Sequence, residues 1–245
     1  MRQKSWSTST RLNVLTFSVC AVLAIESHAS FVIDTFGGVG LTSPWPMHVT
    51  DADPLAYGWD SGVPGVLGGN RDSYLSINFA PSPPPGSSAT ASIDTSAGLL
   101  TVDRTENTPV HLQLVYGGEG GLALDLTTQL GFQIDFGMLD VPVAGAFRVG
   151  VFVWDGSPNE QGSAWAWVDL ALDNPSKVVV PRSSFRAPVN WDTIQLVVFD
   201  FVSIQGDGFT IEQIGTVVPA PAATVFLFAF GLAASYGRRR KRESV

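Results

Sequence analysis

The fold class is decided by two stretches, AFRVGVFVW (residues 146–154) and AWAWVDLAL (residues 164–172), in which every second residue is apolar. Two alternating runs joined by the polar loop DGSPNEQGS predict a β-hairpin. We expect Trp154 to lie opposite Trp165. The residues that then meet on one face, which we expect to be the core, are Phe147, Val149, Val151 and Val153 with Leu172, Leu170, Val168 and Ala166.

The opposite face of this hairpin is rich in aromatic residues. It carries Phe152, Trp154, Trp165 and Trp167, with Arg148 and Asp169 further along. Sugar rings stack on such aromatic surfaces, and neighbouring polar groups can bond their hydroxyls. The same aromatic side chains could instead form a second buried layer under a loop or a neighbouring strand, because large aromatics are usually buried. The sequence leaves both interpretations open.

The rest of the body has the same character between residues 30 and 216. Short runs rich in Val, Ile, Phe, Thr and Trp are separated by clusters of Gly, Pro, Ser and Asn, without a helical period. Regularly spaced strands without helices predict one all-β domain, an antiparallel β-sandwich.

Two parts of the body carry a family resemblance. VLGGNRDSYLSI (residues 66–77) contains a Gly-Gly-x-Arg-Asp strand, and SSFRAPVNWDTIQLVVFDF (residues 183–201) is followed by GDGFTIEQIG (residues 206–215). Together they resemble the strands of galactose-binding-like jelly-roll domains. The resemblance implies a jelly-roll sandwich, a fold that hosts carbohydrate binding, adhesion and scaffolding alike.

The N-terminal segment predicts a secretory signal peptide over residues 1–29. Basic residues precede a mostly apolar run at residues 12–25, which is too short to cross a membrane. Small residues then place a cleavage site between Ala29 and Ser30. The single cysteine, Cys20, lies within this segment, so no disulfide is expected after cleavage.

The C-terminal segment, VVPAPAATVFLFAFGLAASYGRRRKRESV (residues 217–245), has three parts. A proline-spaced motif comes first, formed by Val218, Pro219, Ala220, Pro221 and Ala222. An apolar run follows, long enough with the motif for a transmembrane helix. A basic tail ends the segment and should stay in the cytoplasm; it consists of Arg238, Arg239, Arg240, Lys241 and Arg242.

This tripartite segment resembles the PEP-CTERM family of sorting signals in its VPxPA form, with Ala220 in place of the usual Glu. The resemblance implies export across the inner membrane of a Gram-negative bacterium and a transient membrane anchor. It also implies an exosortase-type membrane transpeptidase as partner and a final place at the cell surface or in the extracellular matrix. An ordinary anchor that is never cut is the alternative.

The net charge and the carboxylates of the body indicate whether nucleic acid or calcium is to be expected as a ligand. The net charge is −8, and most basic residues lie near the termini, so the body is strongly acidic. Such a surface repels phosphate backbones, which argues against nucleic acid as a partner. A structural calcium is the one cofactor considered, because four carboxylates offer hard oxygen donors in a Gly-rich region: Asp51, Asp53, Asp60 and Asp72. Solvated turn residues are the alternative reading.

No catalytic arrangement is recognisable. His48 and His111 lie near no hydrolase motif, and we expect His111 to face solvent from a strand. The carboxylates that a glycosidase would need cannot be paired from the sequence; they are Glu106, Glu119, Asp135 and Asp169. We therefore expect a non-enzymatic exported protein of the surface or matrix. A carbohydrate-binding or adhesive module that contacts extracellular polysaccharide is the alternative, and a secreted glycoside hydrolase is the third candidate.

Overall fold

The computed structural model describes residues 30–38, 45–77, 83–118, 121–158, 161–171 and 175–219. Ser30–Val218 form one compact unit. In the described residues the unit is built from strands joined by loops and short 3₁₀ turns, among them η2 (Leu67–Gly69) and η4 (Arg182–Ser184), so the predicted all-β class is confirmed. The predicted signal peptide and residues 220–245 of the predicted sorting segment lie outside the described residues.

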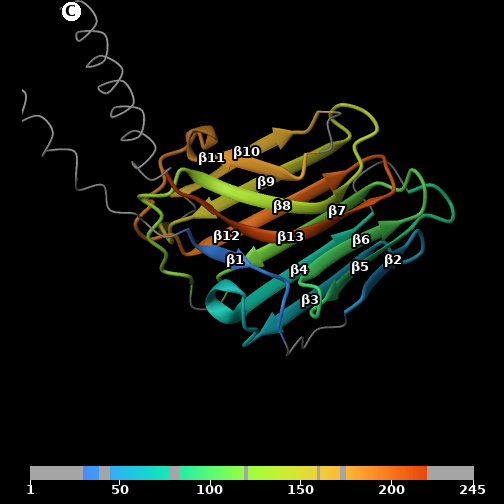
Figure 1. The fold of residues 1–245 in the computed structure, drawn as a ribbon, viewed down its shortest axis with the longest axis horizontal. Helices are drawn as coiled ribbons and strands as arrows, with labels where there is room; N and C mark the ends of the chain where they lie inside the picture. The colour runs from blue at the N-terminus through green and yellow to red at the C-terminus, as the bar shows by residue number, and fades with distance from the viewer. Residues whose placement is uncertain are drawn as a thin grey trace, which may run out of the picture. The chain divides into compact units, whose positions relative to one another are not determined.

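The described part of the unit contains thirteen strands (Figure 1). Their bounds are β1 Val32–Asp34, β2 Met47–Thr50, β3 Leu55–Ser61, β4 Asn70–Ser76, β5 Ser88–Asp94, β6 Leu99–Arg104, β7 Val110–Tyr116, β8 Gly131–Leu139, β9 Phe147–Trp154, β10 Ser163–Asp169, β11 Lys177–Pro181, β12 Leu196–Ser203 and β13 Gly208–Val217.

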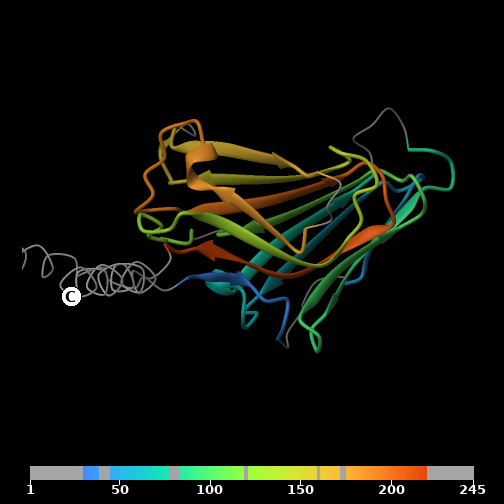
Figure 2. The ribbon, with the colours of Figure 1, turned by 45° about the horizontal axis from the view of Figure 1, so that its top comes forward.

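The strands form two antiparallel sheets, which pack as a jelly-roll-like sandwich (Figure 2). The six-stranded sheet has the order β10-β9-β12-β7-β4-β3. The seven-stranded sheet has the order β11-β8-β13-β6-β5-β2, with β1 paired to β13. From β6 to β9 and again from β10 to β13 each successive strand joins the other sheet, which is why the pairing is mostly between segments far apart in the chain.

Alternation of side chains explains how each strand faces both the core and the surface. In β7 every second residue is buried, from Val110 to Tyr116, and the residues between are half-buried. This two-residue period is the signature of a strand with one face on the core. The central strand β12 departs from it, because its outward residues Val198 and Asp200 are buried as well.

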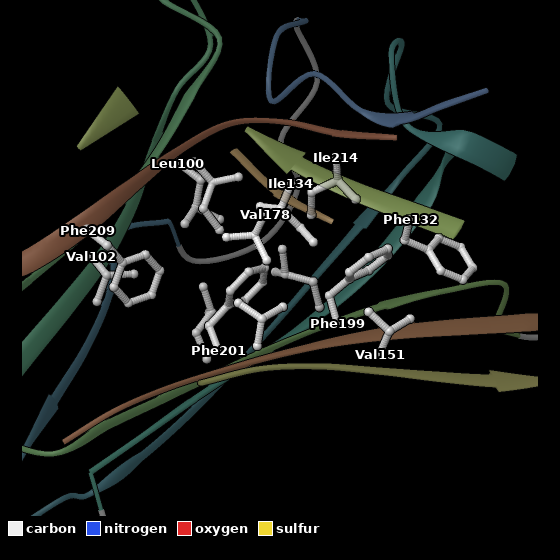
Figure 3. Close-up of a cluster of buried hydrophobic side chains, with 14 of the residues drawn as sticks. Leu100, Val102, Phe132, Ile134, Val151, Val178, Phe199, Phe201, Phe209 and Ile214 are labelled. Carbon is white, nitrogen blue, oxygen red and sulfur yellow. The ribbon is translucent and has the colours of Figure 1, made fainter. Parts of the chain in front are cut away.

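The core between the sheets consists mainly of Val, Leu, Ile and Ala side chains, among which a group of phenylalanine rings packs (Figure 3). Phe199 of β12 meets Phe132 of β8 edge to face, with ring centroids 5.7 Å apart. Phe147 of β9 meets Phe209 of β13 in the same way at 5.0 Å. Each such pair contributes about 0.5–1.5 kcal/mol beyond the area it buries. With no cysteine in the described unit, this packing carries the stability of the sandwich.

The hairpin β9–β10 exists, but the predicted register was wrong by two residues. Ser163, and not Trp165, lies opposite Trp154. The connecting loop closes early because the N–H of Asp155 donates to the carbonyl of Gly162 at 3.1 Å. A shift of two residues keeps every described side chain on its predicted face, so the division into an apolar inner face and an aromatic outer face was right. Leu172, which was predicted for the inner face, lies outside the described residues.

The last strand extends beyond the predicted end of the domain. Val217 was expected to open the sorting segment, but it is the last residue of β13 and pairs with Gly131 of β8. β13 is flanked by β8 along its length, by β6 beside its first half and by β1 beside its second half. Val218 and Pro219 follow as the last described residues of the predicted motif.

Candidate functional site

The outer face of the six-stranded sheet carries the exposed aromatic residues that the hairpin pattern pointed to. The cross-strand pairing aligns outward residues of all six strands in two neighbouring rows. The first row is Trp167, Gly150, Asp200, Gln113, Tyr74 and Tyr57. The second row is Trp165, Phe152, Val198, Val115, Asp72 and Trp59. Aromatic side chains stand at both ends of each row.

One end of the rows is formed by Trp165 and Trp167 of the edge strand β10. Their side chains are 41% and 43% exposed, so the interpretation as a buried second layer does not hold for them. Their rings are parallel within 10°, with centroids 5.3 Å apart. Because stacked carbons touch at about 3.5–4.0 Å, rings at this separation are offset, and part of each face stays open. Phe152 of β9 supports Trp165, with centroids 5.0 Å apart.

Arg148 and Asp169 lie beside this tryptophan pair, as expected. The Nε of Arg148 donates to Oδ1 of Asp169 at 2.5 Å, and the guanidinium lies 5.5 Å from the ring centroid of Trp167. Both side chains are about half exposed. An ion pair in that setting adds little stability, so both groups are available to the hydroxyls of a ligand.

Trp154 differs from its two neighbours on β10. It is half-buried, and its indole N–H donates to the carbonyl of Ser157 at 3.0 Å. This bond ties Trp154 to the hairpin loop, and the loop is held in turn by Asp155, whose carboxylate accepts from the N–H groups of Ser157 and Asn190. The structure therefore assigns the predicted aromatic residues two settings: an exposed pair at 165 and 167, and a supporting pair at 152 and 154.

A second aromatic group at the other end of the rows was not predicted. Tyr57 and Trp59 of the edge strand β3 are 67% and 58% exposed. Tyr57 packs on Tyr74 of β4, with ring centroids 5.2 Å apart. The sequence LAYGWDS holds the signal, because Tyr57 and Trp59 alternate with small or buried residues. The pairing that brings β3 into the same sheet as β10 is long-range and leaves no local trace.

Polar side chains occupy the centre of the outer face. Oδ1 of Asp200 on β12 lies 2.6 Å from Nε2 of His111 and accepts from the amide of Gln113 at 3.1 Å. The ring of Tyr74 meets His111 edge to face at 5.7 Å, which links this centre to the β3 end of the rows. Asp200 itself is buried, so it orients the two side chains on β7. His111 faces outward as predicted, but it is engaged and partly buried.

Asp72 stands in the second row, between Val115 and Trp59. Partial burial raises the pKa of this carboxyl above its usual value, because desolvation disfavours the charged form. The side chain of Asp72 nevertheless stays exposed at the surface, whereas Asp200 is the buried carboxylate of this face.

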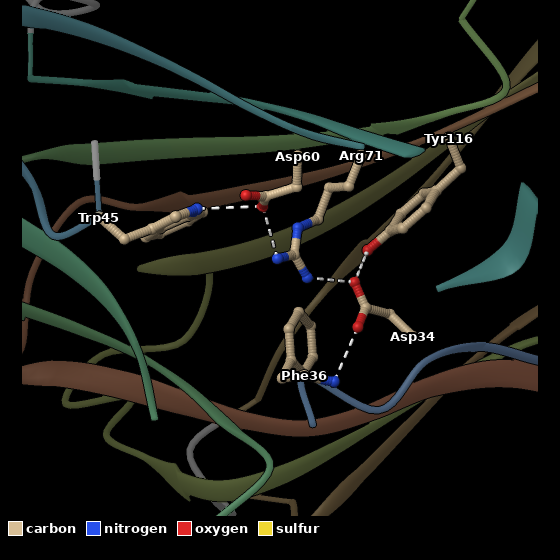
Figure 4. A network of polar contacts seen from close by, with 6 residues as sticks. All are labelled: Asp34, Phe36, Trp45, Asp60, Arg71 and Tyr116. Atoms are coloured by element: carbon tan, nitrogen blue, oxygen red, sulfur yellow. Dashed lines mark hydrogen bonds and ion pairs between the residues drawn. The ribbon is translucent and has the colours of Figure 1, made fainter. Parts of the chain in front are cut away.

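The predicted calcium ligand Asp60 has a different role (Figure 4). It faces the core, where its Oδ2 accepts from Arg71 at 2.7 Å and from the indole N–H of Trp45 at 3.0 Å. Arg71 also pairs with Asp34 at 2.6 Å, and the hydroxyl of Tyr116 donates to the same carboxylate oxygen at 2.8 Å. Burial raises the pKa of Asp34, although the charge of Arg71 opposes the shift.

The four predicted calcium ligands are not brought together. Asp60 faces the core and Asp72 the outer face of the same sheet, while Asp51 and Asp53 lie exposed in the turn between β2 and β3. The carboxylate of Asp51 accepts from the N–H of Gly86. Within the described ranges, no three His, Cys, Asp or Glu residues form a group that could hold a metal ion.

The carboxylates considered for a glycosidase are also scattered. Asp135 lies on β8 of the seven-stranded sheet and pairs with Lys177, whereas Asp169 lies on β10 of the six-stranded sheet. Glu106 is exposed in the turn after β6, and Glu119 lies outside the described residues. These positions give no facing pair among the described candidates.

A pocket of about 570 Å³ lies elsewhere, between the segment that precedes β8 and the turn η4. It is lined by Thr127, Thr128, Gln129, Leu130, Pro181, Arg182, Ser183 and Trp191. The guanidinium of Arg182 covers the ring of Trp191 at 5.1 Å and donates to the carbonyl of Thr127. Because that ring face is already covered, this pocket lacks the open aromatic surface found on the six-stranded sheet.

The part of the chain that the structure describes contains no helix long and apolar enough to cross a membrane. The predicted transmembrane segment, the basic tail and the residue before the predicted signal cleavage lie outside that part. The predictions of a signal peptide and a PEP-CTERM-like segment therefore stay predictions, which mass spectrometry of both ends of the mature protein would check.

No protein-family model and no curated protein sequence matches this chain. Solved structures do resemble it. One is the solution structure of CtCBM11, with a TM-score of 0.43 and 13% identity over 80% of this chain and 99% of that chain. Another is a family 11 carbohydrate-binding module from Clostridium thermocellum in complex with a β-1,3-1,4-mixed-linked tetrasaccharide. Its TM-score is 0.39 and its identity 15%, over 78% of this chain and 98% of that chain. A third is the family 11 xylanase from Neocallimastix patriciarum, with a TM-score of 0.37 and 8% identity over 71% of this chain and 100% of that chain.

These similarities correct the predicted main function. A non-enzymatic protein defined by its sorting was expected, but the similar structures are carbohydrate-binding modules and glycoside hydrolases, which support the alternative. The main prediction was wrong because it gave the segments at the two chain ends more weight than the aromatic outer face of the hairpin, on which the alternative rested. At these identities the likeness concerns the fold, so the choice of ligand has to come from this chain's own residues.

Proposed function

We propose that this protein is a carbohydrate-binding module that holds a polysaccharide on the outer face of the six-stranded sheet. The observation that supports this most directly is the exposed, offset tryptophan pair Trp165 and Trp167. Two large aromatic side chains displayed side by side on a regular strand lose the stabilisation that burial would give them. Such a patch on a soluble domain marks an interaction surface.

The chemistry of this face matches a sugar. The open parts of the indole rings offer flat apolar surface for the C–H face of a pyranose ring. Arg148 and Asp169 beside them supply a donor and an acceptor for hydroxyl groups. A neutral ligand rich in hydroxyls also suits a strongly acidic body, which would repel a phosphate backbone.

The site is also held in place before a ligand arrives. Both tryptophans belong to a strand paired along its length, Phe152 supports one ring, and Gly150 lies beneath the other. Side chains fixed by packing lose little freedom on binding, which favours affinity. We propose binding without hydrolysis, because Asp200 is buried and engaged by His111 and Gln113. The two exposed carboxylates of this face do not face each other, since Asp169 lies on the edge strand β10 and Asp72 on β4, next to the opposite edge.

Affinity electrophoresis tests the proposal, with mixed-linked β-1,3-1,4-glucan, xylan and hydroxyethyl cellulose each cast into the gel. We expect at least one polymer to retard the wild type, and Trp165→Ala and Trp167→Ala each to weaken that retardation about tenfold or more. Val179→Ala is the matched control, because Val179 is an exposed apolar residue on the seven-stranded sheet. Equal retardation of all variants, or no retardation by any polymer, refutes the proposal. Release of reducing sugar would contradict binding without hydrolysis.

A further inference from the structure

We infer that the two aromatic ends of the outer face act on one ligand. A single extended polysaccharide chain crosses all six strands and contacts the tryptophan pair of β10 at one edge and Tyr57 with Trp59 of β3 at the other. This inference rests on the proposed function and adds to it the β3 group, the direction of the chain and the requirement for an internal stretch of polymer.

The first argument is the cross-strand register of the six-stranded sheet. Trp167 and Tyr57 end one row of directly paired residues, and Trp165 and Trp59 end the next row. Both groups therefore lie on the same face and at the same level along the strands. A ligand that leaves the tryptophan pair at a right angle to the strands reaches the β3 group without changing its course.

The second argument is that the residues between the two aromatic groups protrude less than the aromatic side chains at the edges. In the first row the residue next to Trp167 is Gly150, which has no side chain, and the next one, Asp200, is buried. In the second row Val198 is buried and Val115 is half-buried. The exposed aromatic side chains at the edges thus flank inner positions that, apart from the exposed Asp72, are buried or half-buried, with Phe152 and Tyr74 among the half-buried ones.

The centre of the outer face supplies polar groups along the same line. Gln113 and His111 on β7 are oriented by Asp200, and Tyr74 continues the line towards Tyr57. A sugar chain held at both edges would pass its hydroxyl groups over Gln113 and His111. Asp200 is a positioning residue in this arrangement, because it is buried and acts through these two side chains.

The spacing sets the length of ligand that the surface needs. Strands lie about 4.8 Å apart, so the five steps from β10 to β3 place the two ends about 24 Å apart. A disaccharide is too short to bridge that distance. Once a long chain is held at one end, its second contact becomes intramolecular, so the two ends strengthen each other only on a long ligand.

Isothermal titration calorimetry tests this with the polymer that retards the wild type and with its disaccharide and its longest soluble oligosaccharide. The variants are Trp167→Ala, Tyr57→Ala and the double variant, with Val179→Ala as control. We expect one long oligosaccharide per protein molecule, and a loss of about tenfold or more from either single variant. With the disaccharide, Tyr57→Ala should leave binding at the tryptophan pair within about twofold of the wild type.

The outcomes separate the two claims. If Tyr57→Ala binds the long oligosaccharide as tightly as the wild type while Trp167→Ala does not, the proposed function stands and this inference falls. Two long oligosaccharides bound per protein molecule would overturn it in the same way. If the wild type binds none of the polymers, both claims fall. Thermal unfolding of each variant is measured alongside, and a second pair, Trp165→Phe and Trp59→Phe, replaces any variant that fails to fold.

Discussion

The ring of Trp167 lies directly over Gly150 of the neighbouring strand. A Cβ atom at position 150 would stand 2.5–2.7 Å from three carbons of the indole ring, closer than such atoms approach one another. Because Gly150 has no side chain, the ring of Trp167 can lie directly against the backbone of β9 at this position. Gly150 has no left-handed backbone conformation to explain it, so the close approach of the ring is the reason for the glycine.

We expect Gly150→Ala to displace Trp167 and to weaken polysaccharide binding by about tenfold, because a hot-spot ring is moved from its contact position. Affinity electrophoresis measures the loss, and tryptophan fluorescence reports the displaced indole. Gly37→Ala is the control, since a Cβ there meets its nearest neighbour at an ordinary 3.6 Å. Full binding by Gly150→Ala would show that the position of the Trp167 ring does not matter.

Two aromatic residues of the β9–β10 hairpin should differ in role: Phe147 should contribute to stability and Trp167 to ligand binding. Phe147→Ala removes a buried ring that packs on Phe136 and Phe209, and we expect a loss of about 3–5 kcal/mol in the free energy of unfolding. Trp167→Ala removes an exposed ring and should cost much less. Urea unfolding followed by circular dichroism measures both. A loss for Trp167→Ala as large as that for Phe147→Ala would mean that Trp167 serves the core.

Asp60→Ala should destabilise the fold by about 3 kcal/mol or more, because it leaves Arg71 buried with one of its two carboxylate partners. Asp53→Ala, at an exposed turn position that the sequence grouped with Asp60, should change stability little. The same urea experiment compares the two. A calcium-dependent rise in the unfolding temperature that disappears in Asp60→Asn would instead restore the metal interpretation of this residue.

Asp72 should make the stability of the fold depend on pH, and its raised pKa sets the sign of this dependence. Burial raises its pKa in the folded state, so the folded state binds this proton more tightly than the unfolded chain. Its contribution to stability is complete below the unfolded pKa and is lost as the pH rises through the folded pKa. We therefore expect the unfolding temperature of Asp72→Asn to rise relative to the wild type as the pH increases above about 3.9, the usual pKa of an aspartate side chain. The opposite trend would mean that the folded state lowers this pKa.

The faces of the β9–β10 hairpin could be predicted because a strand has a two-residue period, and an even shift of register leaves that period intact. The register itself could not be predicted. It depends on the bond between Asp155 and Gly162 and on the fit of Trp167 over Gly150, and alternation reports neither.

The second aromatic group shows why a site is harder to predict than a fold. Tyr57 and Trp59 reach the same surface as Trp165 and Trp167 only because the hairpin β9–β10 pairs onward through β12, β7 and β4 to β3. Those pairings join segments far apart in the chain. Asp60 was misread for the same reason, since its partners Trp45 and Arg71 lie on separate segments, and a carboxylate in a Gly-rich stretch reads equally well as a metal ligand.

The position of β13 has a consequence for the order in which the molecule can form during synthesis. It is the last strand of the unit, yet it stands inside the seven-stranded sheet, in contact with β8, β6 and β1. Until residues 208–217 have left the ribosome, β6 and β8 have no strand to join them and the first strand has no partner to pair with. The seven-stranded sheet can therefore be completed only after β13 has been translated, and the nascent chain has to keep its unpaired strands and core side chains from aggregating until then.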